Sequence, residues 1–169
     1  MSRRTNPVQN RSHLLDATSV RPGEFAIWEE CSMPHIIGSV FFALVGIVAT
    51  MMAVKGLAAR TLLPFHQQAL GMTWQQLTPG EQEVGLALTR SLGLGFLAAA
   101  VSLFAAAGFA IIGDRHAALL LGCVGLVFCT GLAFVNRELQ ATTAVRTPWR
   151  GALSAALAVA VGMVLCAIG

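Results

Sequence analysis

The chain has 169 residues, of which 56% are hydrophobic and only 11% are charged, and its formal net charge is +3. An average soluble domain carries about 25% charged residues, so this chain has too few to cover a water-facing surface. A nucleic-acid-binding protein needs a clustered basic face, whereas the basic residues here are scattered near the ends of apolar stretches. The composition therefore predicts a protein whose main partner is the lipid bilayer and excludes nucleic acid as a partner.

Residues 1–34 form a polar arm. Its basic residues are Arg3, Arg4, Arg11 and Arg21. A secretory signal would place an apolar core within about the first 15–30 residues, and the arm has none, so we expect the first membrane helix to act as its own insertion signal. Residues 22–33 combine apolar residues such as Trp28 with glutamates, which predicts a short helix in the headgroup region that ends before Pro34.

Four apolar stretches follow, at about residues 35–54, 86–113, 117–135 and 149–168. Each is close to the roughly 20 helical residues that cross a hydrocarbon core of about 30 Å. The stretches lack the polar/apolar alternation of a β-barrel, and unpaired backbone groups are too costly in lipid for any other structure. We predict an all-α, polytopic membrane protein in which residues 35–169 form one domain, an antiparallel bundle of four transmembrane helices.

The connections between these stretches differ in character. The first, about residues 55–82, has Phe65, Leu70, Trp74 and Leu77 near helical spacing, which predicts a second interfacial helix, either lying on the membrane or re-entrant. The tetrapeptide Thr78–Glu81 has the pattern of a capping box with proline at the first helical position, so we expect the next helix to start there. Residues 113–115 predict a tight hairpin, and residues 136–148 a polar loop.

The basic residues give almost no information on orientation. The side of the N-terminus has five, namely Arg3, Arg4, Arg11, Arg21 and Arg115. The opposite side has six, namely Lys55, Arg60, Arg90, Arg137, Arg146 and Arg150. The positive-inside rule needs an excess on one side. Because the basic leader precedes the first helix, we predict that both termini lie in the cytoplasm.

Small residues recur every four positions on the last stretch, at Ser154, Ala158, Gly162 and Cys166. Membrane helices associate where small residues let their backbones approach closely, so this row predicts helix packing. It could pack within the bundle, or it could contact a second copy of the chain or a larger membrane complex.

Arg90 is the most conspicuous polar residue in the apolar stretches, about one turn inside the second one. If the second and third helices are antiparallel, Arg90 lies near the level of Asn136 and Glu138, on the same side as His66. One hypothesis is a ligand-binding polar mouth in which Arg90 holds an anionic headgroup, a quinone or a carboxylate. The alternative is an Arg90–Glu138 ion pair, or an arginine that extends to the headgroups as an anchor.

His35 and His116 open the first and third helices at the same end of the bundle. Two histidines from different helices can ligate a haem b iron, but both lie at the water boundary, where haem is not usually held, so we do not expect haem. The four cysteines form no C-x-x-C pair, and no zinc-ligand spacing is present, so we predict no metal site. No cofactor is required by the sequence.

Motifs of common enzyme classes are missing. There is no G-x-S-x-G turn, no phosphate-binding loop and no dinucleotide-binding glycine pattern. No helix carries the chain of ionisable residues typical of a proton pump or an ion-driven transporter. The sequence favours a protein without catalytic residues.

Short motifs of the chain resemble small four-helix bacterial inner-membrane proteins of the DoxX-like kind. They are residues 65–71 before Trp74, Leu88-Thr89-Arg90, Asn136-Arg137, and Thr147-Pro148-Trp149-Arg150. The polar arm departs from that pattern. The resemblance implies a location in the bacterial inner membrane. Some members of such families resemble accessory subunits of membrane oxidoreductases, and the resemblance implies no catalytic residue here.

Two hypotheses for function remain. The first is a non-catalytic accessory subunit that packs against and stabilises a larger membrane complex (respiratory, photosynthetic or oxidoreductase), with the arm as a docking segment. The second is a small lipophile- or quinone-binding enzyme or carrier that uses the polar mouth around Arg90.

Overall fold

A computed structural model describes residues 33–169 of the chain, and the predicted interfacial helix within residues 22–33 lies almost wholly outside this part. The described elements, in chain order, are α1 (Met33–Leu57), α2 (Pro64–Leu70), the 3-10 helix η3 (Trp74–Gln76), α3 (Pro79–Ile111), α4 (Arg115–Thr143) and α5 (Trp149–Ile168). The four longer helices are long and apolar enough to cross a membrane. The chain is an all-α, multi-pass membrane protein, as the sequence predicted.

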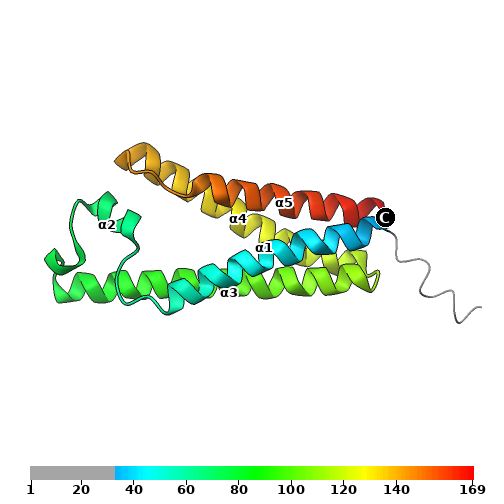
Figure 1. Ribbon diagram of the computed structural model, residues 1–169, viewed down its shortest axis with the longest axis horizontal. Coiled ribbons are helices and arrows are strands. Elements are labelled where there is room, and N and C mark those ends of the chain that lie inside the picture. The colour runs from blue at the N-terminus through cyan, green and yellow to red at the C-terminus, as the bar shows by residue number, and fades with distance from the viewer. Residues whose placement is uncertain (1–32) are drawn as a thin grey trace, which may run out of the picture. The chain divides into compact units, whose positions relative to one another are not determined.

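The four spanning helices run alternately in opposite directions (Figure 1). Helix α1 packs most extensively on α3 and also on α5, and α4 packs on both α3 and α5. Short connections favour antiparallel neighbours of this kind. The centre of the bundle holds the largest fully buried side chains, which are Phe42, Leu103, Val159 and Cys166.

Small residues bring the helix backbones together. A Cβ on Gly56 of α1 would lie 2.9 Å from Cα of Gly93 on α3, and a Cβ on Gly38 would lie 2.9 Å from the carbonyl oxygen of Gly162 on α5. Because lipid is as apolar as these helices, this close packing rather than hydrophobic burial holds them together.

The helix ends show where sequence reasoning succeeded. Thr78 caps α3: its backbone N–H donates to Glu81 Oε2 at 2.7 Å and its hydroxyl accepts from the backbone N–H of Glu81 at 3.4 Å, so the predicted capping box is confirmed. The tight hairpin is also confirmed, because α3 ends at Ile111 and α4 begins at Arg115. Asp114 caps α4 by accepting from the backbone N–H of Ala117 at 3.1 Å.

Three boundaries differ from the prediction. Pro34 lies in the first turn of α1 rather than before it, where its missing N–H costs no helical hydrogen bond. The predicted interfacial helix of the first loop is split into α2 and η3, because Gly71 takes a left-handed conformation (φ 67°) and ends α2. The prediction of a polar loop that begins at Asn136 was wrong, because α4 continues to Thr143.

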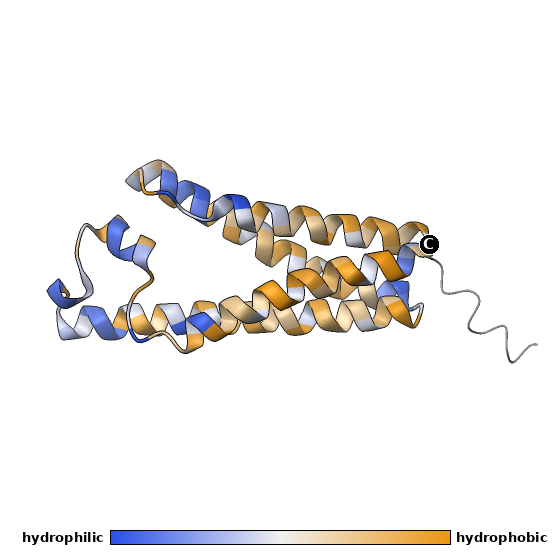
Figure 2. Ribbon diagram, in the orientation of Figure 1, coloured by the Kyte–Doolittle hydropathy of each residue, from blue (hydrophilic) through white to orange (hydrophobic). Residues whose placement is uncertain are grey.

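Helix α3 is longer than the membrane requires. Its 33 residues correspond to about 50 Å, against a hydrocarbon core of about 30 Å. Counting about 20 residues back from the hairpin at Gly113 places the far hydrocarbon boundary near Gly93. About the first four turns of α3 therefore project beyond the hydrocarbon, where α2 and the end of α4 also carry hydrophilic residues (Figure 2).

Candidate ligand-binding cavity

A cavity of about 710 Å³ lies beside the projecting part of α3. Its walls come from α3, α2, the segments on either side of α2 and one residue of α4. The lining residues are Leu62, His66, Ala69, Leu70, Met72, Leu77, Gly80, Glu81, Val84, Gly85, Leu88, Thr89, Leu92 and Leu139. All but three of these residues, His66, Glu81 and Thr89, have apolar side chains or are glycines.

Helix α3 contributes one continuous face to the cavity. Its lining residues are Gly80, Glu81, Val84, Gly85, Leu88, Thr89 and Leu92. They are spaced three or four residues apart in adjacent pairs, which places them along one side of a helix. This face runs from Glu81, outside the hydrocarbon, to Leu92, at its boundary. The cavity therefore extends from the aqueous side across the headgroup region to the edge of the hydrocarbon.

The wall that contains α2 is held in place by two glutamines. Gln67 on α2 donates from Nε2 to the carbonyl oxygen of Leu62 at 2.8 Å and accepts from the backbone N–H of Trp74 at 3.2 Å. Gln82 on α3 donates from Nε2 to the carbonyl oxygens of Trp74 and Leu77, at 3.0 and 3.1 Å. These bonds join both ends of the α2–η3 segment to each other and to α3. These side-chain hydrogen bonds therefore fix the position of the cavity wall.

Two of the three polar side chains of the lining are already engaged. The Thr89 hydroxyl donates to the carbonyl oxygen of Gly85 at 2.8 Å, within α3. Glu81 accepts both the backbone N–H and the hydroxyl of Thr78, at 2.7 and 2.8 Å. Both groups can still accept hydrogen bonds, but neither offers a free donor.

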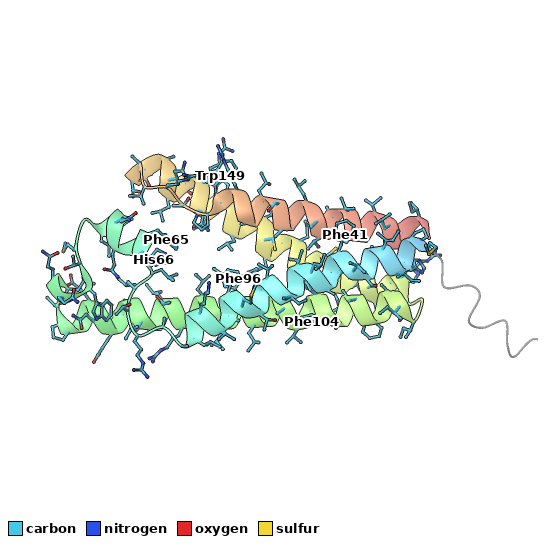
Figure 3. The ribbon with its side chains drawn as sticks, viewed as in Figure 1. Phe41, Phe65, His66, Phe96, Phe104 and Trp149 are labelled. Carbon is cyan, nitrogen blue, oxygen red and sulfur yellow. The ribbon has the colours of Figure 1, made fainter. Side chains whose placement is uncertain are left out.

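His66 is the third polar side chain, and it lies on the side of α2 that faces α3 (Figure 3). Its ring contacts Phe65 edge-on, with the ring centroids 4.1 Å apart. No hydrogen bond joins its ring nitrogens to another residue within 33–169. Partial burial lowers the pKa of His66, because burial disfavours the charged imidazolium. The neutral imidazole retains one N–H donor that no residue within 33–169 uses.

Acidification is expected to loosen the α2 wall. The unfolded segment binds a proton near pH 6.5, whereas the pKa of His66 in the folded wall is lower, so stability falls as the pH drops below about 6.5. Hydrogen exchange of the Phe65–Leu70 amides, corrected for intrinsic rates, would measure this between about pH 5 and 8. In His66→Gln the pH dependence should disappear, while His116→Gln, at the other end of the bundle, should keep it. Persistence of the pH dependence in His66→Gln would assign the effect to a group other than His66 and contradict the prediction.

The structure separates the four residues of the predicted polar mouth. Of these only His66 lines the cavity. Arg90 is exposed, one position beyond Thr89 and so turned about 100° away around α3, and Glu138 is exposed one position before Leu139. No ion pair joins Arg90 to Glu138 in the described part of the chain. Asn136 is buried, and its Nδ2 donates to the carbonyl oxygen of Leu132 at 2.8 Å.

The two histidines considered for haem lie in the first turns of α1 and α4. His116 is exposed, whereas His35 is half-buried and its Nε2 has no hydrogen-bond partner among residues 33–169. Within the same residues, no cluster of three or more His, Cys, Asp or Glu side chains could hold a metal ion. Neither histidine is part of the cavity described above.

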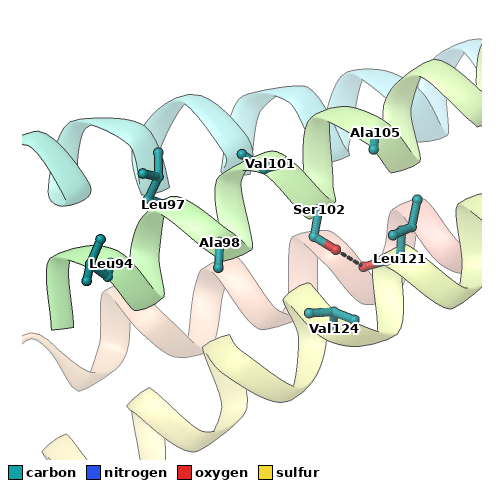
Figure 4. A pocket seen from close by; sticks show the side chains of 8 residues that line it. All are labelled: Leu94, Leu97, Ala98, Val101, Ser102, Ala105, Leu121 and Val124. Carbon is teal, nitrogen blue, oxygen red and sulfur yellow. Dashed lines mark hydrogen bonds between the residues drawn. The ribbon is translucent and has the colours of Figure 1, made fainter. Parts of the chain in front are cut away.

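A second, shallower site lies on the lipid-facing side of α3 and α4 (Figure 4). It measures about 520 Å³ and its lining is apolar apart from Ser102, whose hydroxyl donates to the carbonyl oxygen of Leu121 at 3.0 Å. With that donor occupied, the groove presents little except hydrocarbon side chains. It has no polar group that would distinguish a ligand from the surrounding lipid.

The small-residue row of α5 packs largely within the bundle. Gly162 and Cys166 are buried against α1, where Cys166 Sγ would lie 2.7 Å from a Cβ on Gly38. Ala158 packs against the core, and Ser154 is exposed. Most of this row is therefore occupied by the chain's own helices. A role for it in contacting another subunit stays a prediction.

No protein-family model, curated protein or solved structure matches this chain.

Proposed function

We propose that this protein binds a lipophilic molecule in the cavity beside the start of α3, and that it acts as a lipophile-binding membrane protein or carrier. One observation carries the proposal: a cavity of about 710 Å³ whose apolar face extends from the aqueous side of the headgroups to the hydrocarbon boundary. An amphiphilic molecule bound there would have its polar end on the aqueous side and its apolar chain towards the hydrocarbon.

The size and lining of the cavity support this function. Ligand sites in proteins commonly measure about 300–1,000 Å³ and combine mostly apolar walls with a few polar groups. Ordered water needs two to four polar partners at each position, and the walls formed by Leu62, Leu88 and Leu92 offer none. A lipid chain is the natural occupant of such a space at a membrane surface.

The accessory-subunit hypothesis stays a second prediction. It invoked small-residue rows, and those of α5 are used chiefly to pack the bundle. The bacterial inner membrane and the cytoplasmic position of both termini also stay predictions. The resemblance to DoxX-like proteins belongs with them. None of the three is needed for the lipophile-binding proposal.

Filling the cavity with a large side chain tests the proposal. In Leu88→Trp, on the cavity face of α3, we expect the affinity for a fluorescent lipophile to fall at least about tenfold, because the indole occupies the ligand's space. Binding would be measured by titrating the purified full-length protein in detergent with a polyene fatty acyl probe. The matched control is Leu94→Trp, an exposed leucine of the same helix that lines the other groove.

The control variant should bind the probe as the wild type does, and both variants should melt at similar temperatures. Equal binding by Leu88→Trp and wild type would contradict the proposal. An equal loss in both tryptophan variants would also contradict it, since the probe would then be bound elsewhere on α3.

A further inference from the structure

The cavity lining contains no basic residue, although basic residues are common at this end of the bundle. Six basic residues lie towards this end of the bundle: Lys55, Arg60, Arg90, Arg137, Arg146 and Arg150. None of them is part of the lining. The only formally charged side chain in the lining is the exposed carboxylate of Glu81, whereas Glu83 and Glu138 lie outside the lining with the six basic residues.

We propose that the cavity selects uncharged lipids whose polar end carries a hydrogen-bond-accepting oxygen, with His66 as the donor, and that it disfavours anionic lipids. This inference rests on the proposed function and specifies the class of ligand. It differs from the sequence hypothesis, in which Arg90 would hold an anionic headgroup.

Electrostatic repulsion disfavours an anionic ligand in this cavity. An anionic headgroup inside the cavity would face the Glu81 carboxylate with no lining cation to offset the repulsion. Glu81 is exposed, so water screens this repulsion in part, but no cation of the lining offsets it. The arginines outside the cavity would instead hold anionic phospholipids at the rim, in the headgroup layer.

The polar side chains of the lining offer few hydrogen-bond donors. The Thr89 hydroxyl already donates to Gly85, and Glu81 has no proton to donate while it is ionised. His66 is therefore the free donor among the polar side chains of the lining. Burial lowers its pKa, so the ring is neutral at physiological pH and offers one N–H instead of a positive charge.

A carbonyl or hydroxyl oxygen on an uncharged lipid satisfies that donor without bringing charge into the cavity. Two kinds of lipid share this chemistry: glycerides, through their ester carbonyls and free hydroxyl, and lipoquinones, through their ring carbonyls. The structure favours the shared chemistry, and the choice between the two sources is an arm of the experiment.

Competition binding tests the inference. The purified full-length protein, loaded with the polyene probe in detergent, would be titrated separately with a diacylglycerol, a prenylated quinone and phosphatidylglycerol. We expect at least one uncharged lipid to displace the probe at about tenfold lower concentration than phosphatidylglycerol. Displacement by the diacylglycerol alone, or by the quinone alone, would support the inference and identify the source.

Variants of His66 test the role of the donor. In His66→Phe, which keeps a ring but has no N–H, the advantage of the uncharged lipid should fall about three- to tenfold, the value of one hydrogen bond. His66→Gln keeps a neutral donor and should retain most of it. His66→Lys places a cation in the lining and should move the preference towards phosphatidylglycerol. His116→Phe, at the other end of the bundle, is the matched control and should behave as the wild type.

The outcomes separate the two proposals. Tighter binding of phosphatidylglycerol by the wild type would overturn the inference and leave the proposed function standing, as would an unchanged preference in His66→Phe. Failure of the probe and all three lipids to bind would overturn both.

Discussion

Replacing Leu103 by Ala is expected to lower the free energy of unfolding of the bundle by about 2 kcal/mol, the lower end of the range for a buried leucine. Leu103 is 0% exposed and projects from α3 onto Gly125 of α4, where its Cδ2 lies 2.6 Å from the position of a Cβ on that glycine. Removing it leaves a void that the helices can close only in part. The lower end applies because transfer from lipid contributes little.

Leu94→Ala provides the matched control for this substitution. Leu94 lies on the same helix but is 57% exposed, so the same change should alter stability by no more than about 0.5 kcal/mol. Unfolding in mixed micelles, with increasing denaturing detergent, would measure both variants. Equal effects of the two substitutions would show that α3 does not present Leu103 to the core.

Replacing Gly93 by Ala is expected to destabilise the protein by about 1–3 kcal/mol, although alanine is the better helix former. A Cβ at this position would lie 2.9 Å from the backbone nitrogen of Leu57 and 3.1 Å from the carbonyl carbon of Gly56. Backbone atoms cannot move aside as the end of a side chain can. The crossing of α1 and α3 would therefore have to open.

Gly108→Ala in the same helix should be neutral or stabilising by up to about 1 kcal/mol, because nothing lies within 4 Å of a Cβ there. The pair thus predicts effects of opposite sign for one chemical change. Thermal unfolding in detergent would compare them. Stabilisation by Gly93→Ala would contradict the close approach of α1 and α3.

The spanning helices could be predicted because their signals are local. Apolar length marks them, and the Thr78–Glu81 capping box and the hairpin at Asp114 mark their ends. The prediction of a loop from Asn136 onwards is wrong as far as Thr143, because the polar residues of this segment mark the membrane boundary and not the end of the helix. A helix that continues beyond the hydrocarbon has polar residues for the same reason that a loop does, so composition alone does not separate the two.

The cavity was only partly foreseeable. His66 was predicted to lie at a ligand-binding mouth, and it lines the cavity. Arg90 was predicted to hold the ligand at that mouth, but it is exposed and is not part of the lining. Membrane depth predicts that residues share a level, but a shift of one residue turns a side chain by about 100°. The repeat of apolar and small residues from Gly80 to Leu92 was a readable signal of the cavity face. The position of α2 over that face depends on tertiary hydrogen bonds, which no sequence pattern predicts.

Photo-crosslinking with a bifunctional lipid, followed by peptide mass spectrometry, tests lipophile binding most directly. The probe should be an uncharged lipid with its photoreactive group in the acyl chain, added to membranes that contain the full-length protein. Crosslinks concentrated on α2 and on residues 80–92 of α3, and lost in Leu88→Trp, are the predicted result. Crosslinks spread evenly over the lipid-facing sides of α1, α4 and α5, and unaffected by Leu88→Trp, would contradict it.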